Sequence, residues 1–180
     1  MTDVLLIGSS IFRHWGDGAA EAFPGRSFVN IAVGGTISAD WVPDTGTQHL
    51  RAMLVEYHPA VVGCYVGSND INHGIEAGAI ADNVLSIADA VTAAGAWFAY
   101  FSIIKCPDKR DKLANIDAVH EGITAGLIRR PNCSIVDINP VFDGRDDFFQ
   151  EDGTHLTPDA YTALTKHLKR VNIYEPTGPA

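Results

Sequence analysis

The sequence predicts an α/β fold, in which a parallel sheet is covered by helices on both faces. Two observations lead to this prediction: short apolar segments rich in β-branched and aromatic residues, and helical periodicity in the stretches between them. Continuous apolar strands that alternate with helices are typical of a parallel sheet with right-handed crossover connections. The length of 180 residues and the even composition predict one domain over residues 1–174, followed by a frayed tail, 175–180, with two prolines and a glycine.

Five apolar segments are predicted as strands, because their length and β-branched content fit strands that are buried on both faces. They cover residues 4–7, 27–32, 60–66, 97–104 and 134–138. Helices are predicted between the strands, where apolar residues recur at i, i+3, i+4 and i+7. They cover residues 10–22, 50–57, 80–91, 113–127 and 158–171.

Two helix ends carry clear signals. Gly95 follows the third predicted helix, at a position where glycine commonly ends a helix in a left-handed conformation. Thr157 and Pro158 fit the N-cap and the first residue of the last helix. Both signals fall between a predicted helix and its neighbouring strand or loop, which supports the alternating order.

Charge and composition exclude several classes of function. The chain has 22 acidic and 13 basic residues, a net charge of −9 and a pI of about 5.0. No nucleic-acid partner is expected, because the basic stretches 105–112 and 166–170 are interpreted as solvated ends or faces of helices. No membrane partner is expected either, since no apolar run approaches the ~18 residues of a membrane span.

The first residues and the cysteines indicate a compartment. The N-terminus lacks the basic segment of a signal peptide and has only four consecutive aliphatic residues, so a cytoplasmic location is expected. Cys64, Cys106 and Cys133 are widely spaced and form no metal-binding pattern. They are interpreted as small buried or half-buried hydrophobic side chains, and no metal site is expected.

Polar residues collect just beyond the predicted strands. Ser10, Gly35 and Asn69 each stand three residues after the last apolar residue of one of the first three strands. Ligands of open α/β sheets bind beyond the carboxyl ends of the strands, so a hydroxyl, a bare backbone NH and an amide would meet at one edge. Taken singly, these residues have simpler interpretations as an N-cap, a tight turn and an Asx turn. The residues alone do not separate Ser9 from Ser10 as a nucleophile.

A base with an orienting partner is predicted late in the chain. Asp152 and His155 enclose Gly153, which allows the chain to fold back, and a serine hydroxyl needs such an oriented base to become a nucleophile. The other six histidines lack this spacing and are interpreted as surface or satisfied polar residues. The G-x-S-x-G, G-x-G-x-x-G and H-E-x-x-H motifs are absent, which disfavours α/β-hydrolases, nucleotide-binding domains and zinc proteases.

Four blocks of the sequence together resemble the SGNH hydrolases, or GDSL-type esterases. The blocks are residues 8–11, 30–35, 67–70 and 152–155. Their order and spacing match, and the resemblance runs from about residue 4 to residue 168. It is greatest to small bacterial members whose first block reads Gly-Ser-Ser. The resemblance implies a flavodoxin-like three-layer α/β/α sandwich with a five-stranded parallel sheet of order 2-1-3-4-5.

The resemblance also implies a role for each residue of the site. Ser10 matches the nucleophile, His155 the general base and Asp152 the group that orients the base. Ser10, Gly35 and Asn69 match the three donors of the oxyanion hole. The implied activity is hydrolysis of short-chain carboxylic (acyl or acetyl) esters through an acyl-enzyme. Its partner is a small-molecule ester, and it needs no metal or organic cofactor.

Several features of the sequence bear on the substrate. No insertion is long enough to form a lid, which favours short acyl chains, and the net charge favours neutral esters unless the crevice is locally basic. Trp41 and the loop 105–112 are candidates to line the crevice, with core packing as the alternative for Trp41. Ser9 departs from the family, whose name motif has Asp there, so any hydrogen bonding by that Asp is missing.

Alternative functions remain at this level. A carbohydrate deacetylase, a thioesterase or a lysophospholipase would use the same machinery. A non-catalytic module of the flavodoxin type would instead hold an anion or a nucleotide at the helix that begins at Ser10 and at Gly35. The pair of Asp152 and His155 disfavours that module, because anion binding needs no base with an orienting partner.

Overall fold

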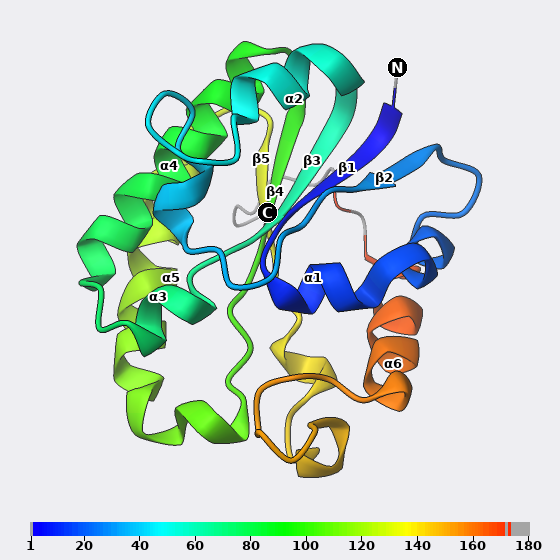
Figure 1. Cartoon of the computed structure of the whole chain (residues 1–180), viewed down its shortest axis with the longest axis vertical. Coiled ribbons are helices and arrows are strands. Elements are labelled where there is room, and N and C mark those ends of the chain that lie inside the picture. Colours follow the sequence, from blue (N-terminus) through cyan, green and yellow to red (C-terminus); the bar gives the residue numbers. More distant parts are fainter. Residues whose placement is uncertain (1, 172, 174–180) are drawn as a thin grey trace.

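A parallel sheet forms the centre of the molecule (Figure 1). The computed structural model describes residues 2–171 and 173. The strands lie in the order β2-β1-β3-β4-β5, and every neighbouring pair is parallel. They are β1 (Thr2–Gly8), β2 (Phe28–Asn30), β3 (Pro59–Tyr65), β4 (Trp97–Phe101) and β5 (Cys133–Val136). The predicted fold class and strand order are confirmed.

Helices cover both faces of the sheet, as predicted (Figure 1). Those on one face are α2 (Leu50–Tyr57), α4 (Ala77–Ala93) and α5 (Leu113–Leu127). Those on the other face are α1 (Ser10–Trp15) and α6 (Pro158–Leu168). Side chains of β1 alternate between the two cores, with Leu5 and Ile7 toward α4 and Val4 and Leu6 toward α1. The sheet is therefore apolar on both faces, which explains why its strands read as continuous apolar runs.

The first and last helices are shorter than predicted. α1 ends at Trp15, and Gly16–Ala22 form a 3₁₀ helix instead of continuing it. Gly16 adopts a φ of +55°, a left-handed value that interrupts the α-helical path. α6 ends at Leu168, three residues before its predicted end.

The fourth strand is also shorter than predicted, because β4 ends at Phe101. Beyond it, the NH of Ile103 donates to Nε2 of His120 at 2.8 Å, and the NH of Ile104 donates to the hydroxyl of Tyr65 at 3.4 Å. Side chains from other elements thus replace a neighbouring strand as hydrogen-bond partners. His120, interpreted as a satisfied polar residue, accepts one of these bonds.

The two predicted helix-end signals are confirmed. Gly95 follows α4 with a φ of +84°. Thr157 is the N-cap of α6, and its hydroxyl accepts the NH of Ala160 at 3.3 Å, while Pro158 takes the first helical position. This cap fixes where the chain turns from the preceding loop into α6.

Trp41 and Lys109, for which the sequence suggested a crevice or a solvated position, are both buried. Trp41 is 1% exposed in the core on the α4 side, so core packing is the correct alternative and the residue does not line a crevice. The interpretation of residues 105–112 as solvated is wrong for Lys109, whose side chain is 0% exposed. Its Nζ lies 3.7 Å from Oδ2 of Asp108 and has no hydrogen-bond partner among the described residues.

The three cysteines are buried and free, as predicted. Among residues 2–171 and 173, no helix is long and apolar enough to cross a membrane. No group of three or more His, Cys, Asp or Glu side chains in this part of the chain could hold a metal ion. The domain boundary at residue 174 stays a prediction, and the tail 175–180 lies outside the described residues.

Candidate active site

The polar residues selected from the sequence lie at the carboxyl edge of the sheet, at the lower end of the strands in Figure 1. Ser10 is the first residue of α1, directly after β1. Gly35 lies in the loop after β2, and Asn69 lies in the short helix α3 (Ser68–Asn72) after β3. The predicted base and its partner lie on the turn before α6. The common edge expected from the strand ends is therefore present.

Ser10, His155 and Asp152 form a continuous hydrogen-bonded chain. Oγ of Ser10 lies 3.1 Å from Nε2 of His155, and Nδ1 of His155 lies 2.5 Å from Oδ2 of Asp152. Because the carboxylate accepts a proton from Nδ1, this pattern assigns the lone pair of the neutral ring to Nε2, which faces the serine hydroxyl. The arrangement can transfer the hydroxyl proton to the imidazole.

The turn that carries His155 also orients Asp152. Oδ1 of Asp152 accepts the backbone NH groups of Thr154 and His155, each at 2.9 Å. The hydrogen bond from the His155 side chain, followed by those from the two NH groups, lowers the pKa of Asp152 to about 2. The carboxylate is therefore ionised at neutral pH and can balance the charge of an imidazolium.

Two backbone NH groups and one amide are available as donors near the serine. The NH of Ser10 belongs to the first turn of α1, where NH groups have no acceptor within the helix. Within the described residues, neither this NH nor that of Gly35 donates a hydrogen bond. The amide of Asn69 donates one hydrogen to the carbonyl of Thr36 at 2.9 Å, which leaves its other hydrogen free. Such a set can stabilise an oxyanion.

A family model matches most of the chain. The GDSL-like lipase/acylhydrolase family matches residues 7–163, a span that includes the serine, the histidine and the three donors. The chain belongs to this family. Its enzyme class is therefore carboxylic ester hydrolase. No curated protein matches the sequence.

Solved structures of similar fold include several esterases. TesA is 23% identical, with 92% of this chain and 95% of that chain covered and a TM-score of 0.73. The psychrotrophic esterase EstA from Pseudoalteromonas sp. is 17% identical, with 93% and 94% covered and a TM-score of 0.74. An acetyl esterase mutant with acetate ion is 18% identical, with 94% and 95% covered and a TM-score of 0.71. At these identities the likeness shows the fold.

The two serines of this family member have different positions. Ser9 is the N-cap of α1 and is 1% exposed, so the alternative in which Ser10 is merely an N-cap is wrong. The NH of Ser9 donates to the carbonyl of Tyr65 at 3.0 Å. Gly8 has a φ of +133°, and a Cβ there would lie 2.1 Å from the same carbonyl oxygen. Ser9 is thus held against β3, whereas Oγ of Ser10 lies within hydrogen-bond distance of His155.

Asp70 positions the loop that carries Gly35, a role that the sequence did not reveal. Its buried carboxylate accepts the NH of Ser38 at 3.0 Å and the hydroxyl of Ser38 at 2.5 Å. Asn83 of α4 donates to the same hydroxyl at 2.9 Å. Because Asp70 follows Asn69 directly, these bonds connect two of the donor segments. The only sequence signal for this role of Asp70 was its place as a carboxylate just after a buried strand.

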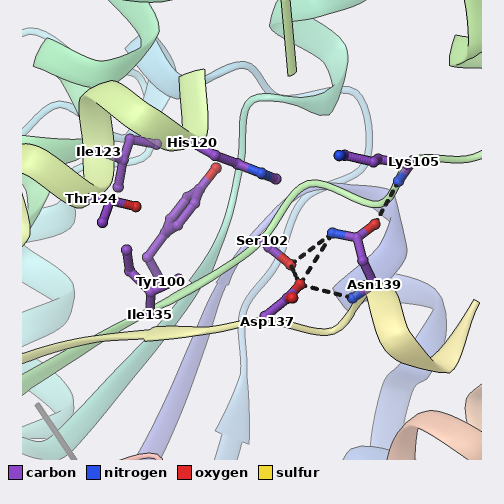
Figure 2. A pocket seen from close by; sticks show the side chains of 9 residues that line it. All are labelled: Tyr100, Ser102, Lys105, His120, Ile123, Thr124, Ile135, Asp137 and Asn139. Carbon is purple, nitrogen blue, oxygen red and sulfur yellow. Dashed lines mark hydrogen bonds between the residues drawn. The ribbon is translucent and has the colours of Figure 1, made fainter. Parts of the chain in front are cut away.

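A polar cluster holds the segment that follows β4 (Figure 2). The side chain of Asn139 accepts the NH of Lys105 at 2.8 Å and donates to the carbonyl of Ile103 at 3.0 Å, while Ser102 donates to Asp137 at 2.8 Å. Burial raises the pKa of Asp137, but hydrogen bonds from Ser102 and Asn139 outweigh it and lower the pKa overall. The cluster lines a cavity of about 280 Å³ beside α5.

The same segment continues to the turn of the histidine. The NH of Asp108 donates to the carbonyl of Gly153 at 3.1 Å, and the hydroxyl of Thr154 donates to Oδ2 of Asp108 at 3.2 Å. A Cβ at Gly153 would lie 3.1 Å from the backbone nitrogen of Asp108. The 3₁₀ helix Pro107–Lys112 therefore supports the turn from outside.

Proposed function

We propose that the protein hydrolyses short-chain carboxylic esters through an acyl-enzyme on Ser10. The observation that carries this proposal is the chain from Ser10 through His155 to Asp152, with distances of 3.1 and 2.5 Å. A serine hydroxyl becomes a nucleophile when an oriented base removes its proton. A module that only binds anions has no use for such a base, so the non-catalytic alternative is disfavoured.

The proposed mechanism has two halves. His155 accepts the proton of Ser10 as Oγ attacks the ester carbonyl, and Asp152 stabilises the imidazolium. His155 then donates that proton to the leaving alkoxide, which departs as an alcohol and leaves the acyl group on Ser10. In the second half, His155 removes a proton from water, and the hydroxide attacks the acyl-enzyme. The carboxylic acid leaves as Ser10 regains its proton.

The negative charge of each tetrahedral intermediate needs donors that are already in place. We assign this role to the NH groups of Ser10 and Gly35 and to the free amide hydrogen of Asn69. Fixed donors stabilise the developing oxyanion without reorganisation, and removal of one typically lowers the rate by roughly 10² to 10³.

An open site supports the preference for short acyl chains. The side chains of His155 and Asp152 are 30% and 49% exposed, and no lid is predicted from the sequence. Long acyl chains gain from enclosed apolar tunnels, whereas soluble short-chain esters reach an open crevice directly. The presence of an acetyl esterase among the proteins of similar fold is consistent with such a substrate.

A substrate panel separates the alternatives that use the same machinery. We expect p-nitrophenyl acetate to be cleaved with a higher kcat/KM than p-nitrophenyl palmitate. Acetylated sugars, an acyl-CoA and a lysophospholipid, assayed alongside, test the deacetylase, thioesterase and lysophospholipase alternatives. Faster cleavage of the palmitate than of the acetate contradicts the short-chain proposal.

Covalent labelling tests the nucleophile. A serine-directed organophosphonate should add one adduct, detected by intact mass and mapped by peptide analysis to Ser10. The adduct should be absent in Ser10→Ala and greatly slowed in His155→Ala. Ser9→Ala is the matched control and should label normally, since the hydrogen bond to Nε2 of His155 comes from Ser10 and the neighbouring Ser9 is the buried N-cap of α1. Unchanged esterase activity in Ser10→Ala would overturn the mechanism.

A further inference from the structure

Arg13 lies at the rim of the candidate site. It follows Ser10 by three residues on α1, which places the two side chains on the same side of the helix. A Cβ at Gly34 would lie 3.3 Å from Nη1 of Arg13 and 3.9 Å from Cβ of Ser10. The guanidinium and the serine therefore flank the same glycine, next to Gly35 with its free NH.

The guanidinium of Arg13 has no acidic partner. The residue is exposed, and within the described part of the chain no carboxylate oxygen lies within 4.0 Å of it. By contrast, Arg51, Arg110 and Arg130 each pair with an aspartate at 2.5 to 2.7 Å. The NH donors of Arg13 therefore remain available to a ligand.

A hollow of about 330 Å³ opens between α1 and β2, and Arg13 lines it. Asn30 in this hollow already has partners, since its side-chain NH₂ donates one hydrogen to the carbonyl of Phe12 at 2.8 Å and its Oδ1 accepts the NH of Ala32 at 3.1 Å. The exposed carboxylate of Asp17 also lines the hollow, farther than 4.0 Å from the guanidinium. Arg13 is thus a cationic donor that lines the hollow and also lies against Gly34, the glycine that contacts Ser10.

We propose that the ester substrate carries a carboxylate or phosphate close to its ester bond, and that Arg13 binds this group. The inference rests on the proposed function of Ser10. A guanidinium binds either anion through paired, charge-assisted hydrogen bonds. Because the net charge of −9 repels anions from the chain as a whole, a local cation decides whether an anionic ester is accepted. The sequence predicts a preference for neutral esters unless the crevice is locally basic. Arg13 supplies such a basic group.

Matched ester pairs that differ in charge test this inference. On the acyl side, the pair is the mono-p-nitrophenyl ester of glutaric acid and p-nitrophenyl valerate. On the alcohol side, the pair is the acetyl ester of 3-hydroxybutyrate and that of its uncharged amide. In at least one pair, the ratio of kcat/KM for the anionic over the neutral ester should exceed one. It should fall about tenfold in Arg13→Gln, the scale of one lost charged hydrogen bond at an exposed site.

Salt and two further variants complete the design. The wild-type ratio should decrease as salt is added, because screening weakens exposed charge pairs. Arg13→Lys should keep part of the ratio. Arg51→Gln is the control and should leave the ratio unchanged, since Arg51 lies on α2 and already pairs with Asp44.

The outcomes separate the two proposals. A ratio that Arg13→Gln does not change, while Ser10 still cleaves both esters, overturns the anionic substrate and leaves the esterase mechanism intact. A wild-type protein that cleaves neither member of either pair overturns the esterase mechanism, and the substrate inference fails with it. The pair that responds shows whether the anion lies on the acyl or the alcohol side.

Discussion

The two sides of the candidate site are held in different ways. The side that carries the proposed oxyanion donors, residues 35–38 and 69–70 (the oxyanion side), is fixed by the buried carboxylate of Asp70, which accepts several hydrogen bonds inside the protein. The base turn, residues 152–155, carries the proposed base and is partly exposed, and its Asp152 carboxylate accepts hydrogen bonds from Thr154 and His155 within the turn itself. The oxyanion side is thus anchored in the buried core, whereas the base turn is a surface loop before α6. Changes to the base turn should therefore lower activity with little loss of stability, whereas changes to the oxyanion side should lower both.

The largest effect on activity is expected on the base turn. His155→Ala removes the proposed base, and kcat/KM for p-nitrophenyl acetate should fall about 10⁴- to 10⁶-fold. The melting temperature should change by about 2 °C or less, because the side chain is partly exposed and its bonds are local. A calorimetric melt and an esterase assay on the same preparation test both. A large loss of stability in His155→Ala would contradict the prediction that the base turn contributes little to the stability of the fold.

The largest effect on stability is expected on the oxyanion side. Asp70→Ala leaves the NH and hydroxyl of Ser38 without their buried acceptor, at a cost of about 2–4 kcal/mol in the free energy of unfolding. Esterase activity should fall as well, because the donor segments lose their connection. Urea denaturation measures the change. Asp89→Ala, which breaks an exposed pair with Arg130, is the control and should cost under about 1 kcal/mol.

The base turn should also contribute a pH-dependent stability. The pKa of Asp152 is about 2 in the folded protein, against 3.8 for an ordinary Asp, so the folded state binds fewer protons between these values. Its contribution is fully present above about pH 4 and is lost as the pH falls toward 2. Asp152→Asn should flatten the pH dependence of unfolding in this window. Urea titrations at pH 2.5 to 5 measure it, and parallel curves for both proteins would contradict the prediction.

The smallest effect is expected where the base turn is supported from outside. Thr154→Val removes the hydroxyl bond to Asp108, and kcat/KM should fall about two- to fivefold with unchanged stability. Thr162→Val is the matched control, because that hydroxyl bonds to its own helix at Pro158. Equal activity in both variants would show that the base turn holds its shape without this support.

The fold was predictable where burial on both faces determines the residue type. Five apolar runs predicted all five strands and their parallel arrangement. The end of β4 was not predictable from the sequence, because Ile103 and Ile104, which follow the single Ser102, are as apolar as the residues of the strand. What ends the strand there is His120, seventeen residues away, which accepts the NH of Ile103. Periodicity holds no information about such a contact.

The site was predictable where it depends on strand ends. Ser10, Gly35 and Asn69 share one offset from their strands, and the structure brings them to one edge. The bond between Asp70 and Ser38 spans 32 residues and depends on packing that no local pattern encodes. The separation of Ser9 from Ser10 came from family resemblance, and in the structure Ser9 is the buried N-cap of α1 while Oγ of Ser10 faces His155.

The buried amine of Lys109 allows the opening of the 3₁₀ helix Pro107–Lys112 to be measured by chemical modification. An amine-reactive reagent can modify the exposed Lys105 at once, whereas Lys109 is 0% exposed and reacts only when its 3₁₀ helix detaches. That helix is hydrogen-bonded to Gly153 and Thr154, so its detachment removes the outer support of the base turn. The rate at which mass spectrometry detects the Lys109 adduct therefore measures how often the turn loses that support in the native protein.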